Sequence, residues 1–146
     1  MKITILTLFF VLCMPTMAQK TFVERSTDVL SVTPTLAALT VSIVENDTKG
    51  MAELGLSTAA TIIANYALEA SIKKSRPDGT GNHSFPSTHT ALAFDGASYM
   101  MKRYGWKWGI PAYAVSTYVA WGRVSADKHD VWEVLGSVAS GNDATL

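Results

Sequence analysis

Residues 91–105, with the sequence ALAFDGASYMMKRYG, follow the spacing of an α-helix. Small and large apolar side chains recur three and four positions apart, at Leu92, Ala93, Ala97 and Met100 or Met101. This spacing places them on one face of a helix. Gly105 then stops the segment, as glycine commonly does at a helix C-terminus. The stretch therefore predicts a helix with an apolar face, ending at residue 105.

Segments on both sides of this stretch are also apolar and alanine-rich, and no alternating strand pattern competes with them. They are residues 29–44, 51–73, 107–124 and 129–141. Pro34 lies inside the first of them, which predicts a kink or a late helix start there. We therefore predict an all-α fold, a compact bundle of about five helices without internal repeats.

The first eighteen residues are typical of a secretory signal peptide. Lys2 precedes an apolar stretch that reaches Cys13, and a small-residue site ends at Ala18. Cleavage there would leave one domain, residues 19–146, and would remove the chain's single cysteine. We therefore expect an exported protein of the periplasm or cell envelope without disulfides or thiol chemistry. The alternative is an uncleaved membrane anchor.

The charge balance argues against a polyanionic partner. Without Lys2, eleven basic residues face twelve acidic ones, and no basic stripe is present. Nucleic-acid binding is therefore not expected. Membrane insertion stays open, because the longest apolar runs reach about 20 residues only if they tolerate Glu53, or Pro34 with its polar neighbours. Buried helices of a soluble bundle show the same pattern, so inner-membrane association and the oligomeric state are not decided.

Residues 76–90, RPDGTGNHSFPSTHT, gather polar chemistry in an otherwise apolar chain. Pro77 is expected to end the preceding helix near Arg76. Ser87 is a good N-cap for the next helix, which places Thr88 and His89 in its first turn. The unpaired N–H groups and partial positive charge of a helix N-terminus suit an oxyanion such as phosphate. His89 is then placed as a proton donor.

Residues 122–133, GRVSADKHDVWE, form a second polar cluster. Asp127 or Ser125 can cap the following helix, which predicts that His129 lies in its first turn. Glu133 follows four residues later on the same face, so its carboxylate can accept the imidazole N–H and leave the other nitrogen free to attack. Arg123 can reach the same anion. The two clusters together predict a metal-free phosphoryl-transfer site.

These residues resemble the motifs of the type 2 phosphatidic acid phosphatases, whose all-helical fold is shared with bacterial nonspecific acid phosphatases and vanadium haloperoxidases. The family motifs are K-x6-R-P, P-S-G-H and S-R-x5-H-x3-D, in this order. Here Arg76-Pro77 matches the end of the first, residues 86–89 resemble the second, and residues 122–133 resemble the third. The resemblance covers roughly residues 69–140.

The resemblance implies a role for each matched residue. His129 would be the nucleophile that forms a phosphohistidine, with Glu133 as its orienting partner. His89 would protonate the leaving oxygen. Arg76, Ser87 and Arg123 would bind the phosphate. We also expect Thr88, and Lys73, which matches no motif position, to bind it. The implied activity is a phosphatase for a phosphomonoester or a lipid phosphate or pyrophosphate, with no metal and no other cofactor.

Four positions depart from the family motifs. Glu69 stands where the family has lysine, and Lys73, one helical turn further on, is expected to replace the missing charge. Thr88 replaces a glycine, Glu133 replaces an aspartate, and Gly122 replaces a serine. In addition, the sequence GNDATL at residues 141–146 is expected to break the last helix where the family's closing helix would continue.

Other functions are compatible with parts of the pattern. A zinc hydrolase could use His83, His89, His129 and Glu133, but the chain has no H-E-x-x-H motif. A serine hydrolase through Ser87 would lack the G-x-S-x-G motif. His83 matches no family position and is expected to be a loop histidine. The main alternative is a catalytically degenerate member of the family that binds phosphate groups or acts as an envelope scaffold.

Overall fold

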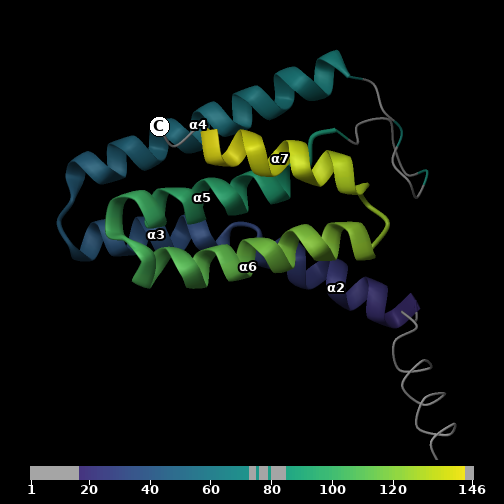
Figure 1. Ribbon diagram of the computed structural model, residues 1–146, viewed down its shortest axis with the longest axis horizontal. Helices are drawn as coiled ribbons and strands as arrows, with labels where there is room; N and C mark the ends of the chain where they lie inside the picture. Colours follow the sequence, from purple (N-terminus) through teal and green to yellow (C-terminus); the bar gives the residue numbers. More distant parts are fainter. Residues whose placement is uncertain (1–16, 73–74, 76–78, 80–84, 144–146) are drawn as a thin grey trace, which may run out of the picture.

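The all-α prediction is confirmed by a computed structural model, which describes residues 17–72, 75, 79 and 85–143. These residues form helices and connecting turns and no strand. The helices, shown in Figure 1, are α2 (Met17–Leu30), α3 (Thr33–Val44), α4 (Thr48–Ser71), α5 (Thr88–Tyr104), α6 (Trp106–Ser125) and α7 (Val131–Asp143).

Helix α5 is the centre of the bundle. It lies between α4 and α7 on one side and α3 and α6 on the other (Figure 1), and it packs against all four. Two hydroxyl groups donate hydrogen bonds to its carbonyls: Thr35 of α3 to the Leu92 carbonyl at 3.0 Å and Ser116 of α6 to the Ala93 carbonyl at 2.7 Å. The apolar core around it consists of Ala38, Leu54, Ala97, Tyr99, Met100 and Ala112.

Each of the five predicted segments forms a helix, but the helices begin and end at other residues than predicted. Pro34 occupies the first turn of α3, so the predicted late start is confirmed. Helix α4 begins three residues earlier than predicted, because the Asp47 side chain accepts a hydrogen bond from the Gly50 N–H at 2.9 Å. Helix α7 runs through Gly141 to Asp143, and because residues 144–146 lie outside the described residues, the predicted break within residues 141–146 stays a prediction. Helix α2 was not predicted.

The crossing of α3 and α5 depends on Gly96. A Cβ atom at this position would lie 2.6 Å from the Pro34 carbonyl carbon and 2.7 Å from the Thr35 Cα, both backbone atoms of α3. Backbone atoms cannot turn aside as the end of a flexible side chain can. Gly55 in α4 offers a contrast, because a Cβ there would meet nothing within 4 Å.

We expect Gly96→Ala to lower the free energy of unfolding by about 3 kcal/mol, because the helices must separate to admit the methyl group. Gly55→Ala is the matched control and should gain about 0.5–1 kcal/mol from its higher helix propensity. Urea unfolding followed by circular dichroism measures both. Equal stability of the two variants would show that α3 and α5 do not cross as closely as described.

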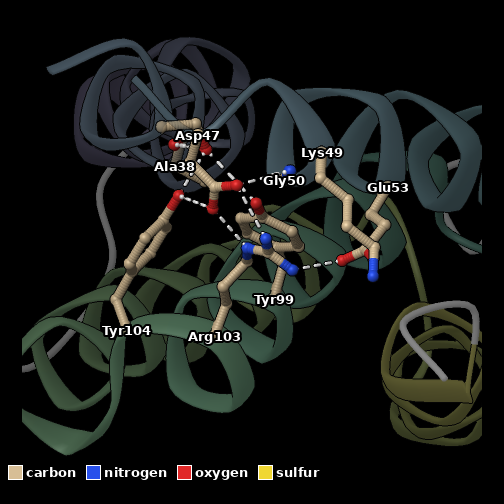
Figure 2. Close-up of polar contacts among 9 residues, drawn as sticks. Ala38, Asp47, Lys49, Gly50, Glu53, Tyr99, Arg103 and Tyr104 are labelled. Carbon is tan, nitrogen blue, oxygen red and sulfur yellow. Dashed lines mark hydrogen bonds and ion pairs between the residues drawn. The ribbon is translucent and has the colours of Figure 1, made fainter. Parts of the chain in front are cut away.

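The C-terminal end of α5 is fixed by a polar network, drawn in Figure 2. Arg103 binds Asp47 at its Nε and Nη2 atoms and Glu53 at its Nη1 atom, with distances of 2.5–2.7 Å. The Tyr104 hydroxyl donates to Ser42 at 2.8 Å. Hydrogen bonds from Arg103 and from the Gly50 N–H hold the pKa of Asp47 well below its ordinary value, and burial raises the pKa of Tyr99 to about 12. This network ties α3, α4 and α5 together.

Asp95 is a buried carboxyl group in the middle of α5. Its Oδ2 atom accepts a hydrogen bond from the Thr58 hydroxyl at 2.7 Å, and its Oδ1 atom has no partner in the part of the chain that the structure describes. The side chain is fully buried. Removal from water raises the pKa of Asp95, and the hydroxyl groups around it offset only part of that effect.

Because the folded-state pKa of Asp95 exceeds the unfolded value, the native state binds more protons, and stability should fall as the pH rises from about 4 through the folded pKa. Asp95→Asn removes the free-energy cost of burying a charged carboxylate. It should therefore stabilise the protein by about 1–3 kcal/mol at pH 7, with little effect at pH 4. Urea unfolding at both pH values tests it, with exposed Asp143→Asn as control. A less stable Asp95→Asn variant at pH 7 would mean that the carboxylate is ionised and paired.

One segment, Gln19–Val44, is long and apolar enough to cross a membrane by length and composition. It lies near the N-terminus and comprises α2 and α3, and 28% of its apolar window is buried within the protein. Core helices of soluble proteins and signal sequences have the same length and composition, so this finding alone does not decide between them.

Candidate active site

The N-terminus of α5 presents Ser87, Thr88 and His89, as predicted. Ser87 occupies the N-cap position, but its hydroxyl makes no capping bond and instead accepts a hydrogen bond from Thr90 at 3.1 Å. The Ser87 N–H donates to the Ser137 hydroxyl of α7 at 2.6 Å. Ser87 is buried, whereas Thr88 and His89 are half-buried. The helix N-terminus therefore lies directly beside α7.

His129 and Glu133 form the predicted pair. The His129 Nδ1 atom lies 3.2 Å from Glu133 Oε2, and both side chains are buried, with exposed fractions of 4% and 0%. The predicted reason for this contact is wrong, however. Helix α7 begins at Val131, so His129 precedes it rather than lying in its first turn.

Asp130, rather than Asp127 or Ser125, caps α7. Its carboxylate accepts a hydrogen bond from the Glu133 N–H at 2.9 Å, and Glu133 Oε2 accepts one from the Asp130 N–H at 3.0 Å. This reciprocal arrangement is a capping box. It fixes the Glu133 carboxylate at the start of the helix, where the same oxygen also meets His129.

Arg123 lies in the last turn of α6 and is buried. Its carbonyl accepts hydrogen bonds from the N–H groups of Lys128 and His129, at 3.1 and 3.2 Å, so the backbone of Arg123 directly supports the turn that presents His129. Its Nη1 atom donates to Asp28 of α2 at 2.5 Å. Its Nε atom is buried and has no hydrogen-bond partner among the described residues.

Two residues outside the predicted motifs join these groups. The Asp28 Oδ1 atom that binds Arg123 also lies 3.5 Å from His89 Nε2. Ser137 links α5 to α7, since its hydroxyl donates to the Glu133 carbonyl at 2.7 Å and accepts from the Ser87 N–H. Ser87, His89, Arg123, His129 and Glu133 therefore belong to one connected site, formed by α2, α5, α6 and α7.

Comparison with protein-family models matches residues 61–142 to the PAP2 superfamily. The matched range includes His89, Arg123, His129 and Glu133 and covers more than half of the chain. The chain belongs to the PAP2 superfamily. The predicted resemblance to the type 2 phosphatidic acid phosphatases is therefore confirmed.

Three PAP2 relatives are phosphatases named for lipid A. The chain is 30% identical over 135 residues to the lipid A 4′-phosphatase of Helicobacter pylori, which is 84% of this chain and 68% of that protein. It is 22% identical over 120 residues to the lipid A 1-phosphatase of the same organism, covering 74% and 61% of the two chains. With the lipid A 1-phosphatase of Porphyromonas gingivalis it shares 35% identity over 69 residues, 45% of this chain and 16% of that one.

No solved structure shows significant similarity to the chain. The family match and the relatives confirm the prediction of a phosphoric ester hydrolase.

The packing of α2 against α6 explains why residue 122 is glycine, where the PAP2 motif has serine. A Cβ atom at Gly122 would collide with the Thr27 Cγ2 atom and lie 3.1 Å from the Val23 Cγ1 atom. Both residues belong to α2. The absence of a side chain at residue 122 therefore allows α2 to lie directly on the end of α6, next to Arg123.

Several predicted residues lie outside the described part of the chain. These are Lys73, Arg76 and His83, so their predicted places stay predictions. Glu69, the charge reversal in the first motif, lies near the end of α4 and is half-buried. Within the described residues, no three or more His, Cys, Asp or Glu side chains are grouped so that they could hold a metal ion.

Proposed function

We propose that this PAP2 chain hydrolyses lipid phosphate esters through a phosphohistidine at His129. The substrate class rests on the three relatives, whose names specify the phosphates of lipid A. The mechanism rests mainly on one observation, the buried contact between His129 Nδ1 and Glu133 Oε2. When Nδ1–H donates to this carboxylate, the lone pair is on Nε2, the nitrogen that can attack phosphorus.

The remaining groups fit a phosphate next to that nitrogen. The Arg123 guanidinium has a buried Nε–H available to a phosphate oxygen, and the N-terminus of α5 adds its partial positive charge. In the proposed first step, a bond forms between His129 Nε2 and phosphorus while the ester P–O bond breaks. His89 gives its proton to the leaving oxygen. In the second step, water displaces the phosphate from His129 and gives its proton to His89.

The described surface supports contact with lipid. Four tryptophan side chains are exposed, and they lie at both ends of α6 and at the start of α7: Trp106, Trp108, Trp121 and Trp132. Tryptophan is enriched where proteins meet the headgroup region of a membrane. Tryptophan side chains can pack either in a protein core or at a membrane interface. Their exposure favours the interface, and it supports our proposal of a location in the cell envelope, after export by the predicted signal peptide.

Phosphate release by the purified full chain in detergent micelles tests the proposal. Lipid A, phosphatidate and an activated aryl phosphate are compared in the presence of a chelator, which leaves activity intact if the proposed side chains suffice. Vanadate, which resembles the five-coordinate phosphorus of the transition state, should inhibit competitively. A folded chain that releases no phosphate from any of the three would support the degenerate phosphate-binding or scaffold protein instead. Thr88 and Glu69 would then be the first residues to restore to the motif.

A further inference from the structure

Helix α2 carries a row of charged residues that form ion pairs with residues 123–128, the segment directly before His129. Lys20, Glu24 and Asp28 are spaced four residues apart and so share one face of the helix. Lys20 pairs with Asp127, Glu24 pairs with Lys128 at 3.1 Å, and Asp28 pairs with Arg123. All three partners lie in residues 123–128, directly before His129. One positive and two negative charges therefore follow one another along α2, and each is paired with a charge of opposite sign in residues 123–128.

The last of these pairs reaches the reacting groups. The Asp28 carboxylate binds only one terminal nitrogen of Arg123, Nη1. A guanidinium group has a second edge, formed by Nε and Nη2, which can bind two oxygens of a phosphate at once. The Nε atom of that edge is buried and has no partner in the described residues. The pairing with Asp28 therefore restrains the guanidinium, and the described contacts leave its Nε atom for a ligand.

The same carboxylate oxygen acts on His89. At 3.5 Å from Nε2 the oxygen is too distant for a strong hydrogen bond, but it lies within ion-pair distance of the imidazole. A general acid must carry its proton when the substrate binds. Thus one oxygen atom of α2 contacts both the arginine and the histidine of the proposed site.

We propose that Asp28 is a positioning residue for phosphoryl transfer: it aligns the Nε edge of Arg123 with the phosphate and holds His89 ready to protonate the leaving group. This inference rests on the proposed function. It assigns to α2, which lies outside residues 61–142 matched by the family model, a role in the active site.

Asp28→Ala tests the proposal, with Glu24→Gln as the matched control. Glu24 lies on the same face of the same helix and also pairs with a cation, but it does not contact Arg123 or His89 in any described interaction. We expect kcat for a lipid or alkyl phosphate to fall about 10- to 100-fold in Asp28→Ala, with KM changed less than threefold, since the misaligned groups act mainly in the transition state. Asp28→Asn keeps an acceptor oxygen and should lose less. Glu24→Gln should stay within about twofold of the wild type.

A second measurement does not depend on turnover. The chain has four arginines, so the Nε–H signal of Arg123 can be assigned in ¹⁵N spectra by its loss in Arg123→Lys. In Asp28→Ala this signal should shift and broaden because the guanidinium is no longer fixed, while it should be unchanged in Glu24→Gln. If the wild type has no activity, the proposed function fails, and this signal still decides whether Asp28 orients Arg123.

Two results would overturn the inference. An unchanged Arg123 signal together with wild-type kcat in Asp28→Ala would leave the contact without a positioning role. A lower KM with kcat unchanged would show that Asp28 instead competes with the phosphate for Arg123. Thermal unfolding of each variant separates these outcomes from a general loss of structure.

Discussion

The His129→Ala variant is expected to release no phosphate above background, a loss on the order of 10⁴-fold or more, because no other group can form the phosphoenzyme. Phosphate release from the activated aryl phosphate measures it. His83→Ala is a suitable control, since this histidine matches no motif. In the wild type, rapid quenching in alkali should trap phosphate bound to His129, and the acid lability of that bond identifies a phosphohistidine.

Because His129 is buried against Glu133, its removal could also disturb the fold. His129→Gln provides the second variant, since its amide can still donate a hydrogen bond to the carboxylate but cannot act as the nucleophile. It should unfold at a temperature close to that of the wild type and be equally inactive. Activity above one tenth of the wild-type value in either variant would exclude His129 as the nucleophile.

His89→Ala is expected to slow the hydrolysis of one class of substrate much more than that of another. With an alkyl or lipid phosphate, whose leaving oxygen needs a proton, the rate should fall about 10²- to 10⁴-fold. With an activated aryl phosphate, whose phenolate leaves unaided, the loss should be much smaller. The half-buried position of His89 in the first turn of α5 allows this substitution without opening a cavity in the core.

The comparison of kcat/KM between the two leaving groups measures this prediction, because kcat/KM reports the first step, in which the leaving group departs. Thr90 provides a control on the same helical turn, since Thr90→Val removes a hydroxyl bonded to Ser87 and should affect both substrates equally. Equal losses for both leaving groups in His89→Ala would assign His89 to phosphate binding rather than to proton transfer.

Local patterns predicted most of the fold. The spacing of apolar residues predicts α5 as a helix, and Pro34 correctly predicts the start of α3. Helix α2 was missed because its sequence, MAQKTFVERSTDVL, is largely polar and follows the apolar stretch that we assigned to a signal peptide. Its contacts are made with residues far along the chain, so no local pattern reveals them.

The candidate site was predicted to a similar extent. The i, i+4 spacing of His129 and Glu133 correctly predicts their contact, although a turn and a capping box, rather than a helix face, produce it. The sequence D-V-W-E at residues 130–133 is a readable capping signal that would have placed the start of α7 correctly. Asp28 could not be predicted, because 95 positions separate it from its partner Arg123.

The docking of α2 has a consequence for the order in which the contacts of the protein form during folding. Asp28 of α2 binds Arg123, which lies 95 positions further along the chain. Contacts across such a separation in sequence form slowly, since a long loop must close first. The contacts of α2 with residues 123–128 are therefore expected to form later than the local contacts within α5. We therefore expect the proposed phosphate site to be complete only after α2 has docked, because Asp28 contacts both Arg123 and His89.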